Sequence, residues 1–389
     1  MNTRQYDLVI FGGGIAGLWA LARARQAGYN AILLETHTVG GVQSIASQGI
    51  IHGGTKYALT GKLTGAAQAI GEMPGIWRDC LQGKGEIDLS AATVLTENQL
   101  LWSTGSLASG MAGFFAGKVM QSRMQTVEKN GYPDLFRSGG FTGSLYQLAE
   151  PVLDTRSVMQ ALYEPLQDVC YQIAMSDLVW LGDNSFEING VGIIKSHHIA
   201  LMAGAGNEAL LHAMGRDKPK MQRRPLQMVM LRGDLPETYA HCLGASANPR
   251  LTITSGRDAD NQVVWYLGGQ VAENGVGLGL HDQVAAGRKE LAEVLPWIDF
   301  ANTEWTTLNI DRAEPLMPGG KRPDDCFIDS RDRIHTCWPT KLAFAPRLAK
   351  LLIEQLKGAI SPSGEPSGQL PLPPPDISAQ PWNEDRTWI

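Results

Sequence analysis

The stretch YDLVIFGGGIAGL, residues 6–18, decides the fold expected for this chain. Its apolar run Leu8–Phe11 has the length and composition of a strand buried in a parallel sheet. A glycine cluster and a helix-favouring segment follow, and a second apolar run, AILL, ends at Glu35. Strand, glycine turn, helix, strand and acid in this order predict a βαβ unit of the Rossmann type in an α/β protein.

The positions of the glycines predict what this unit binds. Gly12 makes the tight turn, Gly14 lets the main chain approach a pyrophosphate, and Gly17 lets the helix pack close to the strand. The N-terminus of the helix directs N–H groups and a positive dipole end at the phosphates, and Glu35 can accept from a ribose hydroxyl. A glycine turn with a purely structural role is the alternative. The residues expected to bind a dinucleotide here are Gly12, Gly14, Ile15, Ala16, Gly17, Glu35 and Thr36.

The segment GGVQSIASQGIIHGGTKY, residues 40–57, extends the predicted site. Small and hydroxyl-bearing residues come first and glycines then flank His52, so the main chain can pass close to a flat ligand that bears phosphates. The residues expected to contact that ligand are Ser44, Ser47, Gln48, Gly49, His52, Gly53 and Gly54.

With this segment the chain resembles the FAD-dependent family of D-amino acid oxidase, sarcosine oxidase and glycerol-3-phosphate dehydrogenase. IHGGTKY at 51–57 is similar to an Ile-His-Gly-Gly-x-basic-Tyr motif of the glycerol-3-phosphate dehydrogenase branch. HIALMAGAG at 198–206 is similar to a strand that ends in Ala-Gly-Ala beside the cofactor, and WPTKLAFAP at 338–346 to the Gly-Gly-Lys-Leu-Thr that opens the last helix. This chain departs from the pattern at Pro339 and Thr340, which replace two glycines, and at Ala343, which replaces a threonine.

The resemblance implies non-covalently bound FAD and a Rossmann-type FAD-binding domain interleaved with an antiparallel-sheet substrate domain. The implied domains are FAD-binding at 1–80, 145–215 and 310–360, substrate-binding at 81–144 and 216–309, and a proline-rich tail at 361–389. The further cofactor contacts that it implies are Ile173, Ala203, Gly204, Arg312, Pro339, Thr340, Lys341 and Leu342.

Several side chains could carry the chemistry of such an enzyme. Lys341, at the start of a helix, would stabilise negative charge on the reduced flavin, with a surface lysine as the alternative. His52 could tune the flavin, carry a proton or attach the flavin covalently, although a lone histidine is more often structural. Lys56 and Arg312 would grip an anionic substrate, unless Arg312 pairs instead with its neighbours Glu314 or Asp311.

The segment 224–280 alternates strand-like runs with turns and predicts an antiparallel sheet. His241 on this sheet could act as a general base, and a half-exposed strand histidine is the alternative. We expect Tyr57, Arg250 and Tyr266 to complete the substrate site. The pair His197–His198 is interpreted as a strand-edge feature and not as a metal site.

Composition excludes several classes of function. A net charge of −6 over 389 residues argues against nucleic acid as a partner. Five scattered cysteines suit reduced thiols in a cytoplasm and predict neither a disulfide framework nor a metal site. No apolar run reaches the roughly 20 residues that span a bilayer. Residues 106–120 could form an amphipathic helix; core packing or a lid is favoured there over peripheral membrane contact, because basic residues do not line the polar face.

The remaining segments have weaker signals. Residues 61–150 are expected to be helical and loop material, and residues 282–295 and 341–357 to form helices. The tail at 361–389 has seven prolines and no hydrophobic period, so a solvated or extended segment is expected, with Trp382 and Trp388 as docking residues.

The sequence thus predicts an FAD enzyme that oxidises a CH–OH or CH–NH bond of a small, anionic metabolite by hydride transfer to flavin N5. Oxygen, a quinone or a carrier protein would reoxidise it. The alternative from another class is a flavoprotein maturation or assembly factor that acts on a partner protein. A third interpretation, an NAD-dependent dehydrogenase, predicts no flavin spectrum.

Overall fold

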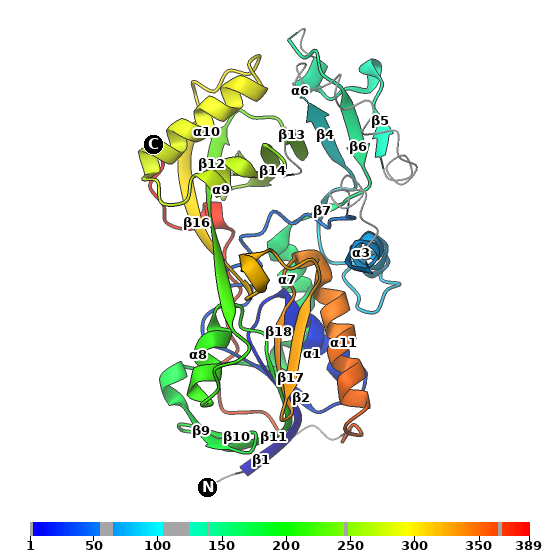
Figure 1. Ribbon diagram of the computed structural model, residues 1–389, viewed down its shortest axis with the longest axis vertical. Helices are drawn as coiled ribbons and strands as arrows, with labels where there is room; N and C mark the ends of the chain where they lie inside the picture. Colours follow the sequence, from blue (N-terminus) through cyan, green and yellow to red (C-terminus); the bar gives the residue numbers. More distant parts are fainter. Residues whose placement is uncertain (1–2, 55–64, 104–123, 138–139, 245–247, 365–367) are drawn as a thin grey trace.

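The chain folds into two lobes stacked along one long axis, each built on an eight-stranded sheet in the described part of the chain (Figure 1). The computed structural model describes residues 3–54, 65–103, 124–137, 140–244, 248–364 and 368–389. The predictions for Lys56, Tyr57 and a helix at 106–120 lie outside the described residues.

The first lobe grows from the βαβ unit that the sequence predicts. β1 (Thr3–Phe11) pairs in parallel with β2 (Ala31–Glu35) on one side and with β11 (Gly192–Leu201) on the other. The sheet runs in the order β17-β18-β11-β1-β2-β8, and β10 and β9 extend from β11. Its other strands are β8 (Cys170–Gln172), β9 (Leu178–Gly182), β10 (Ser185–Ile188), β17 (Phe327–Arg331) and β18 (Ile334–Trp338).

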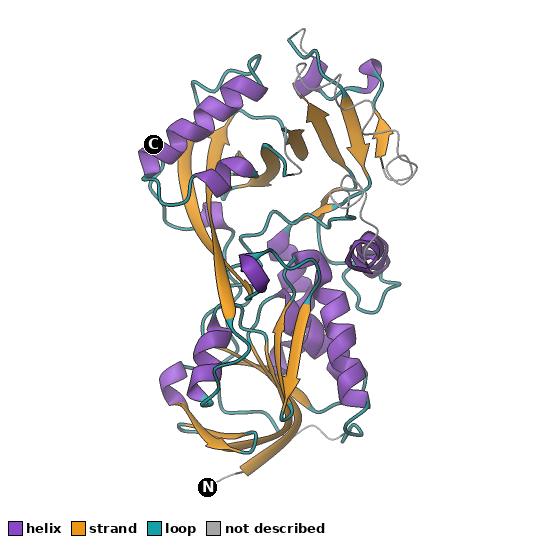
Figure 2. Ribbon diagram, viewed as in Figure 1, coloured by secondary structure: helices purple, strands orange, loops and turns teal. Residues whose placement is uncertain are grey.

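Helices cover both faces of this sheet (Figure 2). Leu8 and Ile10 of β1 pack in the cluster formed with α1 and α11, whereas Val9 and Phe11 pack on the opposite face with α8. This alternation along a strand buried on both faces explains the unbroken apolar run. The helices of this lobe are α1 (Ile15–Gln26), α3 (Gly65–Leu81), α7 (Thr155–Tyr163), α8 (Gly206–Ala213) and α11 (Ala345–Lys357).

The second lobe is a sheet in the order β16-β12-β15-β14-β13-β4-β6-β5, antiparallel except for the parallel pair β13 and β4. Its strands are β4 (Gln99–Ser103), β5 (Met124–Thr126), β6 (Leu145–Leu148), β12 (Met221–Gly233), β13 (Ala240–Leu243), β14 (Leu251–Arg257), β15 (Val263–Gly268) and β16 (Glu304–Pro315). Its helices are α6 (Asp134–Arg137), α9 (Gln270–Asn274) and α10 (Leu280–Val294).

Short elements complete the described structure. A small sheet pairs β3 (Val94–Thr96) with β7 (Val152–Leu153). The 3₁₀ turns are Lys129–Gly131, Glu164–Val169, Met175–Asp177, Pro318–Gly320, Leu342–Phe344 and Pro381–Asn383.

The expectation that residues 61–150 are helical and loop material is wrong for part of this segment. α3 is present, but β4, β5 and β6 complete the second sheet. The reason is that β4 pairs with β13, whose residues lie more than a hundred positions further along the chain, as in the pair Leu101 and His241. Such short strands are specified by a distant partner and not by their own pattern.

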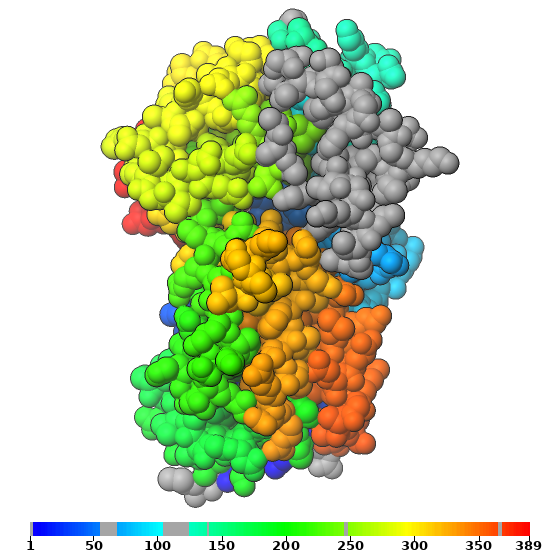
Figure 3. Space-filling model, viewed as in Figure 1, coloured from blue at the N-terminus to red at the C-terminus, as the bar shows by residue number. Residues whose placement is uncertain are grey.

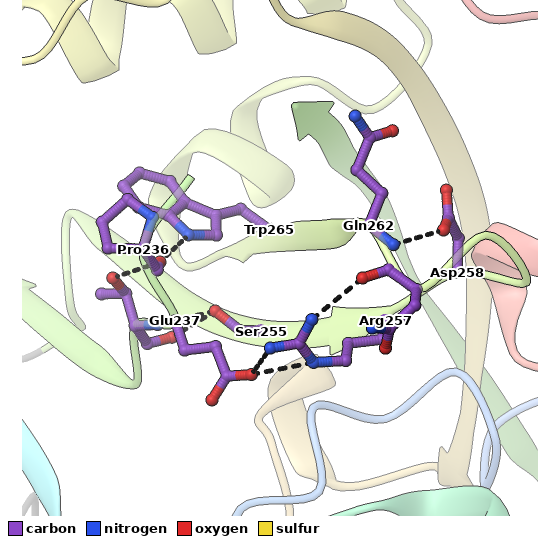
Figure 4. Close-up of polar contacts among 9 residues, drawn as sticks. Pro236, Glu237, Ser255, Arg257, Asp258, Gln262 and Trp265 are labelled. Carbon is purple, nitrogen blue, oxygen red and sulfur yellow. Dashed lines mark hydrogen bonds and ion pairs between the residues drawn. The ribbon is translucent and has the colours of Figure 1, made fainter. Parts of the chain in front are cut away.

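A polar network fixes the loop that leads into β13 (Figure 4). Trp265 Nε1 donates to the carbonyl oxygen of Pro236 at 2.7 Å, and Arg257 donates from Nε and Nη2 to Glu237 Oε1 at 3.0 and 2.6 Å. The hydroxyl of Ser255 accepts from the N–H of Thr238 at 2.7 Å. These hydrogen bonds hold the loop in place, so β13 starts at a fixed position.

The tail at 361–389 is extended, as expected, and it contacts both lobes although most of its described residues are exposed. Ile377 forms a parallel bridge with Val39 in the first lobe, and Ile389 exchanges two main-chain hydrogen bonds of 2.9 Å with Trp305 in the second. Trp382 Nε1 donates to the carbonyl oxygen of Arg257 at 2.9 Å. The tail therefore contacts both lobes. Among the described residues, no helix has the length and apolar character needed to cross a membrane.

Candidate active site

The glycine turn after β1 has the geometry that its sequence predicts. Gly12 has a φ of 110°, which residues with a Cβ rarely adopt, and a Cβ there would lie 2.6 Å from Cα of Ala203. A Cβ on Gly17 would lie 1.9 Å from the carbonyl oxygen of Gly12. Helix α1 therefore packs directly on the turn, and its first turn contains no acidic residue that would repel a phosphate.

The carboxylate of Glu35, at the end of β2, faces the glycine turn. Its Oε2 accepts from the N–H of Gly13 at 2.5 Å, and its Oε1 accepts from the N–H groups of Thr36 and His37 at 2.7 and 2.9 Å. The N–H of Ile173 donates to the main-chain oxygen of Glu35 at 2.9 Å. The hydroxyl of Thr36 also donates to Oε1, at 3.4 Å, whereas the N–H of Gly13 is the donor to Oε2. A carboxylate oxygen has two lone pairs, so Oε2 keeps an acceptor site for a ribose hydroxyl.

The segment after β2 wraps around the start of α1. Ser44 Oγ accepts from the N–H of Ile15 at 2.9 Å, and Ser47 Oγ donates to the carbonyl oxygen of Ser44 at 2.9 Å. Gly49 has a φ of 69°, and a Cβ there would lie 2.0 Å from the carbonyl oxygen of Leu153. The main chain here passes close to other main-chain atoms, and this requires the small residues that are predicted to lie along the ligand.

The opposite side of this cradle comes from the ends of β11 and β18. Gly204 has a φ of 57°, and its carbonyl oxygen accepts from Trp338 Nε1 at 3.0 Å. Asn207 accepts from the N–H of Ala203 at 2.8 Å and donates to the carbonyl oxygen of Cys337 at 3.0 Å. This buried amide holds the two strand ends together.

These features fit FAD. At Gly12 and Gly17 an added Cβ would clash with main-chain atoms. The carboxylate of Glu35 offers an acceptor for the ribose, and the start of α1 favours an anion. Lys341 stands where the sequence predicts, because a 3₁₀ turn begins after it and leads into α11; its place at the flavin end stays a prediction.

The departure at Thr340 has a structural consequence. Thr340 has a φ of 61°, in the left-handed region where the resembling family has glycine, and its hydroxyl donates to the carbonyl oxygen of Asp325 at 3.0 Å. The turn before Lys341 and Leu342 therefore keeps a glycine-like conformation although Pro339 and Thr340 are not glycines. Lys341 Nζ lies 5.2 Å from the centre of the Phe344 ring.

Three ionisable side chains meet where the two lobes join. His52 Nδ1 lies 3.2 Å from Glu150 Oε2, and Glu150 Oε1 accepts from the N–H of Gly53 at 2.8 Å. The ring of His241 lies nearly parallel to that of His52, with 6.3 Å between their centres. One ligand atom from each of these three side chains lies within 4.8 Å of the other two.

Burial sets the charge of His241. The side chain is buried on β13, and this burial, together with the smaller effect of the neighbouring His52, lowers its pKa to about 4, while Glu150 opposes the shift. Its Nδ1 lies 2.8 Å from the hydroxyl of Thr252, its cross-strand partner on β14. His241 is therefore neutral at pH 7, when one ring nitrogen has a lone pair and the other carries a proton.

Arg312 lies on β16 beside a cluster of charged residues. Its Nε donates to the carbonyl oxygen of Arg224 at 3.1 Å, and Arg224 and Arg322 approach the buried Glu314 at 3.7 and 4.0 Å. Asp311 pairs with another arginine, Arg223, at 2.8 Å. Both carboxylates that the sequence suggested as partners of Arg312 thus pair with other arginines, and no carboxylate of the described residues forms an ion pair with Arg312.

The charge in this cluster is unbalanced. Burial, and after it the neighbouring Arg322 and Arg224, lower the pKa of Arg312 to about 10 although Glu314 and Glu273 oppose the shift, so the guanidinium is still charged at pH 7. The cluster is tied to the cofactor loops, because the N–H of Ala313 donates to Gln43 Oε1 at 3.1 Å. In the space-filling view the segment that follows β16 (orange) lies at the surface between the two lobes (Figure 3).

Other residues predicted to bind substrate or cofactor have protein partners. Arg250 forms ion pairs with Glu290 and Glu293 of α10. The hydroxyl of Tyr266 is buried and donates to the carbonyl oxygen of Ala46 at 2.9 Å. Gln48 Nε2 donates to the carbonyl oxygen of Tyr266 at 3.0 Å. The contacts of Tyr266 and Gln48 join the two lobes, and those of Arg250 lie within the second lobe. Because the polar groups of these three side chains already have protein partners, we leave them out of the proposed site.

Sequence reasoning did not identify four residues of these clusters. Gln43 and Glu150 stand in no motif, and nothing in their local sequence distinguishes them. Arg224 and Arg322 could have been suspected, because Arg223-Arg224-Pro225 is a basic run before a strand and Lys321-Arg322-Pro323 follows the predicted arginine element.

Comparison with known proteins agrees with this cradle. Residues 7–306 match the family model described as DAO, FAD dependent oxidoreductase. The chain is 45% identical over 376 residues to the probable FAD-dependent oxidoreductase PA4991 of Pseudomonas aeruginosa, covering 95% of both proteins. The crystal structure of the FAD dependent oxidoreductase PA4991 from that organism superposes with a TM-score of 0.84 at 39% identity, covering 98% of both chains.

More distant solved structures share the fold. An L-α-glycerophosphate oxidase from Mycoplasma pneumoniae with FAD bound has a TM-score of 0.65 at 15% identity, covering 99% of this chain and all of its own. A glycine oxidase from Geobacillus kaustophilus has a TM-score of 0.64 at 13% identity, covering 91% and 95%. The Rossmann-type cofactor lobe, the sheet lobe and the dependence on FAD predicted from the sequence are thereby confirmed, and the chain belongs to the DAO family of FAD-dependent oxidoreductases.

Proposed function

We propose that this enzyme oxidises a CH–OH or CH–NH bond of a small anionic metabolite where its two lobes meet. The observation that carries the proposal is the charge around Arg312: three arginines surround one buried carboxylate, and no described carboxylate pairs with Arg312. A partly buried cationic cluster of this kind favours an anion, and a guanidinium can grip a carboxylate or phosphate with two parallel hydrogen bonds. Lys56 is proposed as a second contact to the anion.

The proposed base is His52, held by Glu150. A carboxylate at 3.2 Å stabilises the imidazolium that forms when the ring takes a proton from the substrate's hydroxyl or amine. The amide of Gly53 donates to the same carboxylate, so the group that accepts from the His52 ring is held in place. His241 stays neutral and can donate to or accept from the substrate without bringing a second positive charge.

The remaining residues would hold the cofactor. Non-covalently bound FAD would supply a ring that accepts the hydride equivalent at N5. Glu35, Ser44 and the glycine turn are proposed to bind its adenosine and phosphate end. Lys341 is proposed to stabilise negative charge at the flavin end, where the start of the last helix favours it.

Anaerobic bleaching of the bound flavin tests this function. The purified protein is mixed without oxygen with 2-hydroxy acids, amino acids and polyol phosphates, each beside a neutral analogue of the same carbon skeleton. We expect an anionic compound to bleach the flavin absorbance at roughly 450 nm. Its neutral analogue should leave this absorbance unchanged. Bleaching by the neutral analogue at the same rate would contradict an anion site, and bleaching only after a partner protein is added would support the assembly factor.

A further inference from the structure

The cluster of His52, Glu150 and His241 has a composition that the proposed proton transfer does not require. One base and one carboxylate suffice for that step, yet a second histidine is buried within 4.8 Å of both. The three side chains come from a loop after β2, from the segment between β6 and β7, and from β13. Because these residues are far apart in sequence, only the tertiary fold brings them together.

Main-chain pairing fixes two of the three positions. Ile50 forms an antiparallel bridge with Val152, and the N–H of Ile51 donates to the carbonyl oxygen of Pro151 at 2.9 Å. These contacts set His52 opposite Glu150, whose carboxylate the N–H of Gly53 also orients. The third position, His241, is fixed by the sheet, where β13 lies between β14 and β4.

The cluster also has a supporting hydrogen bond of the kind that orients metal ligands. Thr252 Oγ1 lies 2.8 Å from His241 Nδ1 and can accept its proton, which leaves the lone pair on Nε2. Two imidazoles and one carboxylate are a common ligand set for zinc, and they leave a fourth position open for water or a substrate oxygen.

We propose that His52, Glu150 and His241 bind one divalent transition-metal ion, with zinc as the probe. The sequence predicted no metal site because its five cysteines are scattered; this site uses no cysteine and has no local spacing that a motif could reveal. Tetrahedral zinc with bonds of about 2.1 Å places ligand atoms ~3.4 Å apart. The His52–Glu150 pair already has this spacing at 3.2 Å, and the His52 side chain, 44% exposed, is the one that can move.

Zinc bound at this cluster would slow the reaction, a consequence that rests on the proposed function. Zinc would take the lone pair of the proposed base, so zinc should slow bleaching of the flavin by substrate in proportion to occupancy. Zinc binding itself is measured without substrate, and failure of one proposal is therefore distinguishable from failure of the other.

The test is calorimetric titration of zinc into the FAD-bound protein after dialysis against a chelator. We expect one zinc per chain, and at least tenfold weaker binding for each of His52→Gln, Glu150→Gln and His241→Gln. Thr252→Val, which keeps the side-chain shape and removes the supporting hydroxyl, should weaken binding by about 10- to 100-fold. FAD content and thermal unfolding of every variant show whether it is folded.

Two histidine variants are matched controls. His335→Gln breaks a buried pair with His198 that has no carboxylate, and His281→Gln removes an exposed histidine. Both should bind zinc as the unsubstituted protein does. The proposal is overturned if the unsubstituted protein binds no zinc at millimolar concentration, or if His335→Gln weakens binding while the three cluster variants do not. Anomalous density for zinc within bonding distance of Glu150 would support it independently.

Discussion

At the scale of single residues, the cofactor cradle depends on a few positions that tolerate little change. Gly12 and Gly17 have no room for a methyl group, because main-chain atoms stand where it would lie. Glu35 is different, since its carboxylate binds three N–H groups and still has lone pairs to offer. Its substitution therefore tests ligand binding without a steric clash.

Glu35→Ala should weaken FAD binding by about tenfold or more, because a lost hydrogen bond to a charged group is worth roughly 1.5–3 kcal/mol. The measurement is the dissociation constant of FAD, from reconstitution of flavin-free protein. Glu354→Ala, an exposed acid on α11, is the control and should leave the constant unchanged. An unchanged constant for Glu35→Ala would mean that this carboxylate does not contact the ribose.

Arg312→Lys should weaken substrate binding although the charge is kept, because a lysine cannot form the planar two-pronged contact. Arg312→Ala should cost more, on the order of 2–5 kcal/mol if the anion is left buried and unpaired. Sulfate and short carboxylates should shift the flavin spectrum of the unsubstituted protein and lose this effect in both variants.

The control for these variants is Arg223→Lys, because Arg223 is exposed and pairs with Asp311. It should bind anions normally. A stable, active Arg312→Ala variant together with an unsubstituted protein that ignores every anion would remove the reason to expect an anionic substrate.

Local sequence rules reached the cradle residues but not the clusters at the lobe junction. A glycine that needs a positive φ, or an acid after a strand, is a local requirement, so Gly12 and Glu35 could be predicted. Glu150 meets His52 across 98 positions, and Arg224 meets Glu314 across two strands. Such pairs depend on the tertiary fold, which a pattern within one segment does not contain.

At the scale of elements, strands β11 and β18 carry a buried histidine pair between them. His198 Nδ1 lies 2.9 Å from His335 Nε2, and His335 Nδ1 lies 2.7 Å from the hydroxyl of Ser330. Burial, together with the smaller effect of the neighbouring His198, lowers the pKa of His335 to about 4, and burial also lowers the pKa of His198. Both rings are therefore neutral in the folded protein at pH 7.

This pair should make the protein less stable in acid. Between pH 6.5 and 4 the unfolded chain binds a proton at His335 that the folded protein does not, so the free energy of unfolding falls as the pH falls through this window. The lowered pKa of His198 acts in the same direction below pH 6.5. Because of His335, the free energy of unfolding should be about 3 kcal/mol lower at pH 4 than above pH 6.5. Urea unfolding at several pH values measures it.

His335→Gln should unfold with a shallower pH dependence in this window, and the exposed His281→Gln should follow the unsubstituted protein. Equal slopes for His335→Gln and the unsubstituted protein would show that His335 is protonated in the folded state.

Whether a helix or strand could be predicted from the sequence depends on how far along the chain its partners lie. α10 and α11 were predicted because a helical period is written in one segment. β4 and β6 were not, because four or five residues have too little pattern to show a strand whose partner is distant. The second sheet was therefore predicted in part, through its strands β12, β14 and β15.

At the scale of the whole molecule, the tail links the lobes. Val39 of the first lobe pairs with Ile377, and Trp305 of the second pairs with Ile389. Between these points the ring of Trp382 packs on Gly256 of β14, where a Cβ would lie 2.2 Å from a ring carbon. The glycine near the end of β14 is explained by this aromatic neighbour.

Gly256→Ala should displace the Trp382 ring and destabilise the protein by about 1–3 kcal/mol, the usual cost of overpacking. If the clash with Trp382 is the cause, the same substitution should cost little in a Trp382→Ala background, so the two effects should not add. Urea unfolding of the four proteins measures this coupling, and limited proteolysis of Gly256→Ala should show earlier cleavage in the tail. Gly75→Ala in α3, where an added Cβ meets nothing within 4 Å, is the control and should be neutral or slightly stabilising. Additive costs for Gly256→Ala and Trp382→Ala would mean that the tail is not held against this strand.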